Sequence, residues 1–110
     1  MRMAIILALV LLGACSRGGE ADLPAIVAMR SAAAEWALVN REALRGRLTA
    51  SYAAGMRAAA REAIATEARG LRDNAAAARE GAALQALPGD AAPEQIARHA
   101  AALERIEKAL

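Results

Sequence analysis

The sequence has very few aromatic and cysteine residues. Its 110 residues include no Phe, one Trp, one Tyr and one Cys. A single Cys excludes a disulfide-stabilised scaffold and a cysteine-rich metal module, and the scarcity of Val, Thr and aromatic residues disfavours a sheet protein. The length limits the chain to one domain. Alanine is abundant instead, with 34 copies, and alanine is the strongest helix former. The composition therefore predicts an all-α protein.

The first fifteen residues have the pattern of an export signal. Arg2 provides a short positive region, and residues 3–12 are wholly apolar. This apolar run is too short to cross a bilayer, which takes about 20 residues. It ends in Leu12-Gly13-Ala14-Cys15. These four residues resemble the lipobox of bacterial lipoprotein precursors, in which an aliphatic residue and two small residues precede an obligatory Cys.

The resemblance implies that residues 1–14 are a signal peptide, cleaved between Ala14 and Cys15, and that Cys15 then carries acyl chains. Two or more acyl chains hold a protein stably at a membrane. Ser16, in a position where Asp favours the inner membrane, implies an outer-membrane anchor with the chain facing the periplasm. The less favoured alternatives are the inner membrane and a secreted protein cut after Ala14, for which Leu12 is a poor −3 residue.

Residues 15–23 form the predicted tether between the lipid and the folded part. The segment has no apolar period and contains the adjacent glycines Gly18 and Gly19. A flexible linker of this length has a mean reach of about 15 Å. The composition changes at Leu23, so we expect the helical domain to occupy residues 24–110.

Helix signals begin directly after the tether. Asp22 is the expected N-cap, and Pro24 stands in the first turn, where its missing N–H costs nothing. No proline follows until residue 88. We favour one long helix from 24 to about 72 over two helices, although Gly46 and Gly55 each weaken it by about 1 kcal/mol. If the helix breaks, Thr49 or Ser51 is the expected new cap.

Two shorter helices are expected farther on. Asp73 or Asn74 caps a helix over 75–86, and a Pro88-Gly89 turn leads to a last helix from about residue 92 to the C-terminus. The predicted fold is an elongated alanine-rich helical hairpin or small bundle of one long and two shorter helices. Its core is thin, so exposed apolar strips should need a partner or a second copy. The candidate apolar contact residues are Trp36, Tyr52, Ile96, Leu103, Ile106 and Leu110.

Positive charge gathers between residues 41 and 61. Residues 41–62 contain two glutamates, Glu42 and Glu62, against five arginines, which are Arg41, Arg45, Arg47, Arg57 and Arg61. The segment could contact anionic membrane, lipopolysaccharide or an acidic partner, although an ordinary solvated helix face is the simpler interpretation. Nucleic acid is not an expected partner, because the chain from Cys15 onward has 13 basic and 12 acidic residues and only two aromatic residues for stacking.

Catalysis and metal binding need polar groups that converge, and the sequence offers few. His99 is the single histidine and has no second ligand at metal spacing. An acylated Cys15 is no nucleophile, and neither a G-x-S-x-G motif nor a glycine-rich phosphate loop is present. We therefore expect no enzyme activity, no metal and no cofactor.

The lipobox and the alanine-rich helix together also resemble small helical envelope lipoproteins such as the murein-lipoprotein type. Those proteins attach to peptidoglycan through a C-terminal Lys, whereas here Lys108 is followed by Ala109 and Leu110. The expected function is that of a non-enzymatic, lipid-anchored, periplasm-facing envelope lipoprotein that binds another envelope component or itself through apolar helix faces. The alternative is an amphipathic helical protein whose basic 41–61 segment contacts anionic membrane or lipopolysaccharide.

Overall fold

The computed structural model describes residues 20–110. Predictions for residues 1–19, the lipobox and Cys15 among them, lie outside the described residues. The described part contains helices and no strand, so the all-α prediction is confirmed. After a short 3₁₀ helix, η1, come four α-helices: η1 is Glu20–Asp22, α2 Leu23–Leu44, α3 Ala50–Arg69, α4 Ala75–Ala86 and α5 Pro93–Ala109.

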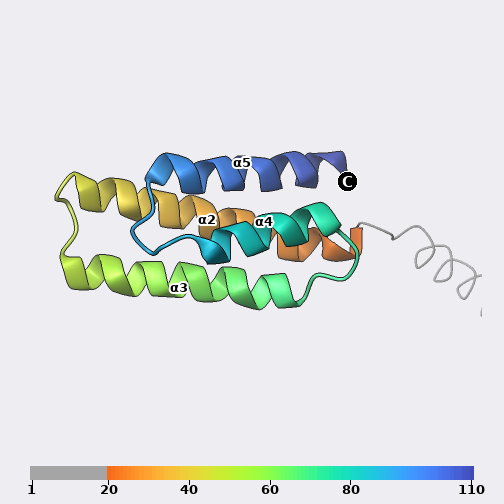
Figure 1. Ribbon diagram of the computed structural model, residues 1–110, viewed down its shortest axis with the longest axis horizontal. Coiled ribbons are helices and arrows are strands. Elements are labelled where there is room, and N and C mark those ends of the chain that lie inside the picture. The colour runs from red at the N-terminus through yellow and green to blue at the C-terminus, as the bar shows by residue number, and fades with distance from the viewer. Residues whose placement is uncertain (1–19) are drawn as a thin grey trace, which may run out of the picture.

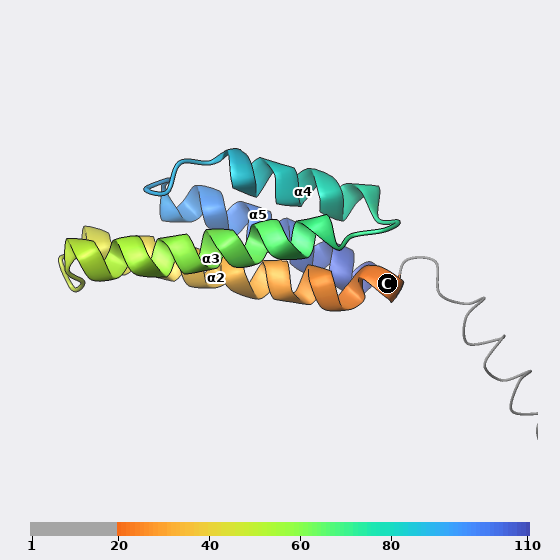
Figure 2. The ribbon, with the colours of Figure 1, turned by 90° about the horizontal axis from the view of Figure 1, so that it is seen from below.

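The four helices form a bundle in which each helix runs antiparallel to the one before it (Figure 1). The most extensive packing is that of α2 against α5 and α3, while α4 packs against both α3 and α5. Figure 2, turned by 90°, shows the same arrangement from below. The topology is up-down-up-down with short connections, as in many small helical bundles.

The single long helix predicted over 24–72 is wrong. The chain ends α2 at Leu44 and begins α3 at Ala50, and the two helices form a hairpin. Gly46 lies in the connection with a φ of 72°, in the left-handed region that glycine tolerates without a steric cost. Thr49 is the new cap, because its Oγ1 accepts a hydrogen bond from the Tyr52 amide at 3.2 Å. Gly55, the other suspected break, lies inside α3.

Cap positions near the other end of the bundle differ partly from the sequence-based prediction. Asp22 does precede α2, but its side chain makes no cap hydrogen bond to that helix. The carboxylate bonds to the chain between α3 and α4 instead. Asn74 caps α4, since its Oδ1 accepts a bond from the Ala77 amide at 2.9 Å. The helix over 75–86 has the predicted bounds.

The core is small and rich in alanine, as the composition implied. Half of its fourteen clustered buried residues are alanines, and the larger ones are Ile26, Met29, Trp36, Ile64, Leu84, Ile96 and Leu103. Small side chains let the helices approach closely. At Gly81 of α4 an added Cβ would lie 3.2 Å from the sulfur of Met29 and 3.3 Å from the Cβ of Ala68, so α4 packs there directly on α2 and α3.

Unequal helix lengths leave one end of the bundle incomplete. With a rise of 1.5 Å per residue, the 22 residues of α2 span about 33 Å and the 12 residues of α4 about 18 Å. Beyond the end of α4, the connection from Leu87 to Ala92 packs against α2. The end of the α2–α3 hairpin projects past both α4 and α5 (Figures 1 and 2). We call this projection, residues 41–52, the α2–α3 tip.

Candidate functional site

The α2–α3 tip and the adjoining turn of α2 carry most of the exposed large apolar side chains of the described residues. The exposed fraction is 78% for Leu44, 56% for Tyr52 and 52% for Leu38, and only Leu110 joins them in this class. Leu48 is half-buried. Leu44 lies at the tip, beyond the reach of α4 and α5, whereas Leu38 is exposed although its neighbours Ala37 and Val39 are buried. Large exposed apolar side chains at one end of a fold are typical of an interaction surface.

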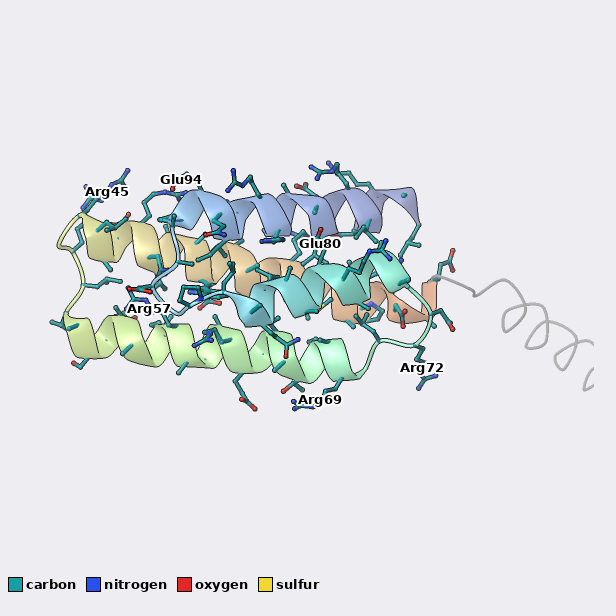
Figure 3. The ribbon with its side chains drawn as sticks, in the orientation of Figure 1. Arg45, Arg57, Arg69, Arg72, Glu80 and Glu94 are labelled. Atoms are coloured by element: carbon teal, nitrogen blue, oxygen red, sulfur yellow. The ribbon has the colours of Figure 1, made fainter. Side chains whose placement is uncertain are left out.

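Arginines surround the apolar side chains of the tip. Arg45 and Arg47 are exposed and Arg41 is half-buried. Glu42 is the only acidic residue of the tip, and its two carboxylate oxygens accept bonds from Arg45 at 3.2 Å and from Arg47 at 3.1 Å. Three arginines against one glutamate leave the tip with a formal charge of +2. Figure 3 shows Arg45 at the outer end of α2.

The other two arginines of the basic segment do not join the tip. Arg57 donates from Nε to Oδ1 of Asn40 at 2.6 Å, and Arg61 donates to the Leu87 carbonyl at 3.3 Å. The Arg61 guanidinium also lies over the Trp36 ring, 5.6 Å from its centroid, which is within the range of a cation–π contact. In Figure 3, Arg57 points toward the connection between α4 and α5. The structure thus divides the 41–61 segment into a surface group at the tip and an inward group on α3.

These inward groups belong to a polar cluster that holds the α4–α5 connection. The Trp36 Nε1 and the Asn40 amide both donate to the Gly89 carbonyl, at 2.8 and 3.0 Å, and the same amide donates to Ala91 at 2.8 Å. Asn40 is buried and uses both its amide hydrogens and its oxygen. A buried amide with every group bonded stabilises one arrangement, because any shift leaves a polar group without a partner. The cluster therefore holds the α4–α5 connection against α2, beyond the end of α4.

Asp22 makes a second polar link at the opposite end of the bundle. Its buried carboxylate accepts backbone N–H bonds from Arg72 at 2.8 Å, Asp73 at 2.8 Å and Asn74 at 2.7 Å. Burial alone would raise the pKa of Asp22, but these hydrogen bonds and the charge of Arg72 outweigh it and lower the pKa from its ordinary value of 3.8. The link joins the start of α2 to the α3–α4 connection.

Most of the predicted apolar contact residues are part of the core. Trp36, Ile96 and Leu103 are fully buried, and Ile106 packs against the core with partial exposure. They therefore offer a partner little or no surface in this fold. Tyr52 and Leu110 are exposed, the first on the tip and the second at the C-terminal end of α5.

The sequence contains no motif typical of a reaction centre, and the described residues include one pair of a histidine and a carboxylate on neighbouring helices. His99 Nδ1 lies 2.6 Å from Glu80 Oε2, and the pair joins α5 to α4 with each side chain about one quarter exposed. Within residues 20–110 no group of three or more His, Cys, Asp or Glu could hold a metal ion. A surface hollow between α3 and α4 is lined by Ala58, Arg61, Glu62, Ala65 and Gln85.

Sequence reasoning missed both polar links. Asn40 stands four residues after Trp36 on an otherwise apolar face of α2. A polar side chain in such a position is expected to be buried and hydrogen-bonded, and this could have indicated the link. Which groups it bonds depends on the path of the α4–α5 connection. For Asp22 the sequence suggested a local cap, and the actual partners are 50 to 52 residues away along the chain.

Comparisons of the chain with protein-family models, with curated proteins and with solved structures found no match. None of the helices in residues 20–110 has both the length and the apolar character needed to cross a membrane. The four helices define the class of the described part as a small all-α bundle. Its candidate functional surface is the α2–α3 tip.

Proposed function

We propose that the chain is a non-enzymatic, lipid-anchored envelope lipoprotein that faces the periplasm and binds another envelope component or a second copy of itself. The observation that carries the proposal is the sequence Leu12-Gly13-Ala14-Cys15, followed after a short tether by a bundle whose first long helix begins at Leu23. Acylation of Cys15 would hold the bundle by the end at which α2 starts. Ser16 favours the outer membrane over the inner membrane.

The binding surface proposed from the sequence needs revision. The apolar faces of α2 and α5 are used within the fold, where Trp36, Ile96 and Leu103 are buried. The exposed apolar surface lies chiefly at the α2–α3 tip, at the end of α2 far from its first residue, Leu23 (Figure 1). A lipid anchor at one end and an exposed apolar and basic surface at the other suit a protein that presents the tip to a second component.

The alternative is an amphipathic helical protein whose basic 41–61 segment contacts anionic membrane or lipopolysaccharide. Arg41, Arg45 and Arg47 are placed for such contact, because they lie at the projecting tip. Arg57 and Arg61 bond to the polar cluster instead. In this alternative the contact is restricted to the first three arginines.

Fatty-acid labelling tests the anchor. Cells that express a C-terminally tagged chain are grown with a clickable fatty acid, and the wild type is compared with Cys15→Ala. We expect labelling of the wild type only, together with a smaller mass of the processed chain. Ser16→Ala is the matched control, since it leaves the lipobox intact and should label as the wild type does. Equal labelling of wild type and Cys15→Ala refutes the lipoprotein assignment.

In-cell cross-linking with mass spectrometry tests the binding role. Photo-reactive residues are placed at Leu44 and Tyr52 on the tip, and at Ala78 on the exposed side of α4 as a control. Discrete cross-linked species from the tip positions, with none from Ala78, support a protein contact at the tip. Links between two copies point to a homo-oligomer, and links to another envelope component point to a heterologous partner. Identical patterns from all three positions contradict a tip-specific contact.

A further inference from the structure

We propose that the α2–α3 tip docks on the surface of an anionic phospholipid bilayer. This inference names the partner of the surface described above, and its physiological setting rests on the proposed function. The tip combines two features that such a surface recognises: large apolar side chains exposed at the end of a helical hairpin, and arginines placed among them.

The apolar groups of the tip fit the boundary between headgroups and acyl chains. Leu44 is the most exposed large apolar side chain of the described residues, and Tyr52 is exposed in the first turn of α3. An amphipathic helical element buries its apolar groups about 5–10 Å deep in this boundary. Tyrosine is enriched there, because its ring is apolar and its hydroxyl remains hydrated. Removing the two side chains from water would stabilise the bound state.

The charge of the tip matches an anionic surface. Arg45 and Arg47 have side-chain exposed fractions of 53% and 65%; Arg45 directly follows Leu44, and the two arginines flank Gly46. Arginine can keep its guanidinium in the headgroup layer while its alkyl stem covers apolar neighbours. Glu42 opposes this attraction in part, since it carries the one negative charge of the tip. Each basic residue close to an anionic membrane strengthens binding about fivefold.

The outer face of α2 extends the same surface along the bundle. Leu38, Arg41 and Arg45 are spaced by three and four residues, so they lie on one side of α2. Leu38 is about half exposed. The tip lies about 33 Å along α2 from the end at which the tether enters. Contact of the tip with the bilayer that holds the acylated Cys15 therefore requires the bundle to lie along the membrane, attached at two points.

Vesicle binding by a chain that starts at Ser16 tests the docking without the anchor. This chain keeps all of residues 20–110, which contain the four helices and the whole described core, and circular dichroism checks that it is helical. Tyr52→Trp provides the probe at the tip. Trp36 is fully buried and contributes a constant background. We expect the tryptophan emission to shift to shorter wavelength with vesicles of phosphatidylglycerol and phosphatidylcholine, and to stay unchanged with phosphatidylcholine alone.

Matched variants identify the tip as the binding surface in a vesicle co-sedimentation assay. Arg45→Gln with Arg47→Gln should weaken binding to anionic vesicles about twentyfold, whereas Arg69→Gln with Arg79→Gln removes the same charge elsewhere and should weaken it less than threefold. Figure 3 shows Arg69 near the opposite end of the bundle from Arg45. Leu44→Ser should weaken binding about tenfold, and Leu110→Ser, another exposed leucine, should not. Glu42→Gln should strengthen binding about fivefold.

The results separate docking on lipid from the other occupants of the tip. Binding that depends on the tip residues and declines as salt is raised supports the proposal. No binding to anionic vesicles overturns it, and so does equal weakening by the tip variants and the control variants. Self-association without lipid that Leu44→Ser abolishes also overturns it, because a second copy then covers the tip. None of these results alters the labelling of Cys15, so failure of the docking and failure of the anchor are distinguishable.

The lipidated full chain tests the two-point attachment. With Tyr52→Trp in liposomes that contain brominated phosphatidylglycerol, contact of the tip with the bilayer brings the indole within range of the bromine atoms and quenches its emission. We expect strong quenching in the wild-type background and little with Arg45→Gln and Arg47→Gln. Absence of quenching in both backgrounds means that the bundle stands away from the membrane, and this refutes docking of the anchored form.

Discussion

Replacing Asp22 tests whether a buried carboxylate joins the start of the bundle to the α3–α4 connection. Asp22→Ala removes the acceptor of three backbone N–H groups, those of residues 72, 73 and 74. A hydrogen bond to a charged group contributes about 1.5–3 kcal/mol. The side chains of Arg72 and Asp73 are exposed, so water can reach part of the freed backbone and the losses do not simply add. We expect the free energy of unfolding to fall by about 2–4 kcal/mol.

Urea unfolding followed by circular dichroism and by Trp36 fluorescence measures this loss. Trp36 is fully buried, so its emission reports loss of the core. With a slope of about 1 kcal/mol per molar urea for a domain of this size, the midpoint should shift by about 2–4 M or the variant should be largely unfolded in buffer. Asp22→Asn keeps the shape of the side chain and most of its size, and it should lose about 1–3 kcal/mol. Asp90→Asn, at an exposed aspartate in the α4–α5 connection, is the control.

The dependence on pH gives a second measurement. The pKa of Asp22 is lowered in the fold, so its stabilising contribution is present above the ordinary value of 3.8 and is lost as pH falls through the lower folded pKa. The difference in unfolding free energy between wild type and Asp22→Asn should therefore be large at pH 6 and should shrink below pH 3.8. If this difference stays constant across the range, the charge of the Asp22 carboxylate is not the source of the stabilisation. If Asp22→Asn loses no more stability than Asp90→Asn, Asp22 does not stabilise the fold by joining α2 to the α3–α4 connection.

Three further experiments test the fold. Gly46→Ala should destabilise the protein by about 1 kcal/mol because of the positive φ. Gly55→Ala, inside α3, should stabilise it by about 0.5–1 kcal/mol. If urea unfolding shows that both substitutions stabilise the protein, the chain does not leave the helical conformation at Gly46. Asn40→Ala leaves two carbonyls of the α4–α5 connection without their amide donor, and we expect a loss of about 2–4 kcal/mol and faster hydrogen exchange in that connection. A double-mutant cycle of Glu80→Ala and His99→Ala should give a coupling of about 0.5–1.5 kcal/mol, and zero coupling rules out the pair as a link between α4 and α5.

The sequence and the structure agree where local signals were strong. The run of helix formers between Asn74 and the Pro88-Gly89 turn predicted the bounds of one helix, and the same turn predicted the start of the last helix near residue 92, one residue before Pro93. These signals are local, because caps, turns and periodicity act within a few residues. The prediction of a continuous helix through Gly46 was wrong for the same reason. Helix propensity assigns Gly46 and Gly55 the same modest cost, so it does not show which glycine ends a helix. The packing of α3 back onto α2 decides that the chain turns at Gly46.

The sequence by itself determined that the chain is helical, where two of its helices lie and that its core is poor in large side chains. Only the tertiary structure decided which apolar and basic residues face outward. Trp36 is buried and Tyr52 exposed, while Arg57 turns inward and Arg45 outward. The reason is geometric: whether a residue is covered depends on how far the neighbouring helices extend, and α4 and α5 end before the α2–α3 tip. The surface proposed to bind an anionic membrane exists because α4 is short and α5 begins only after the α4–α5 connection.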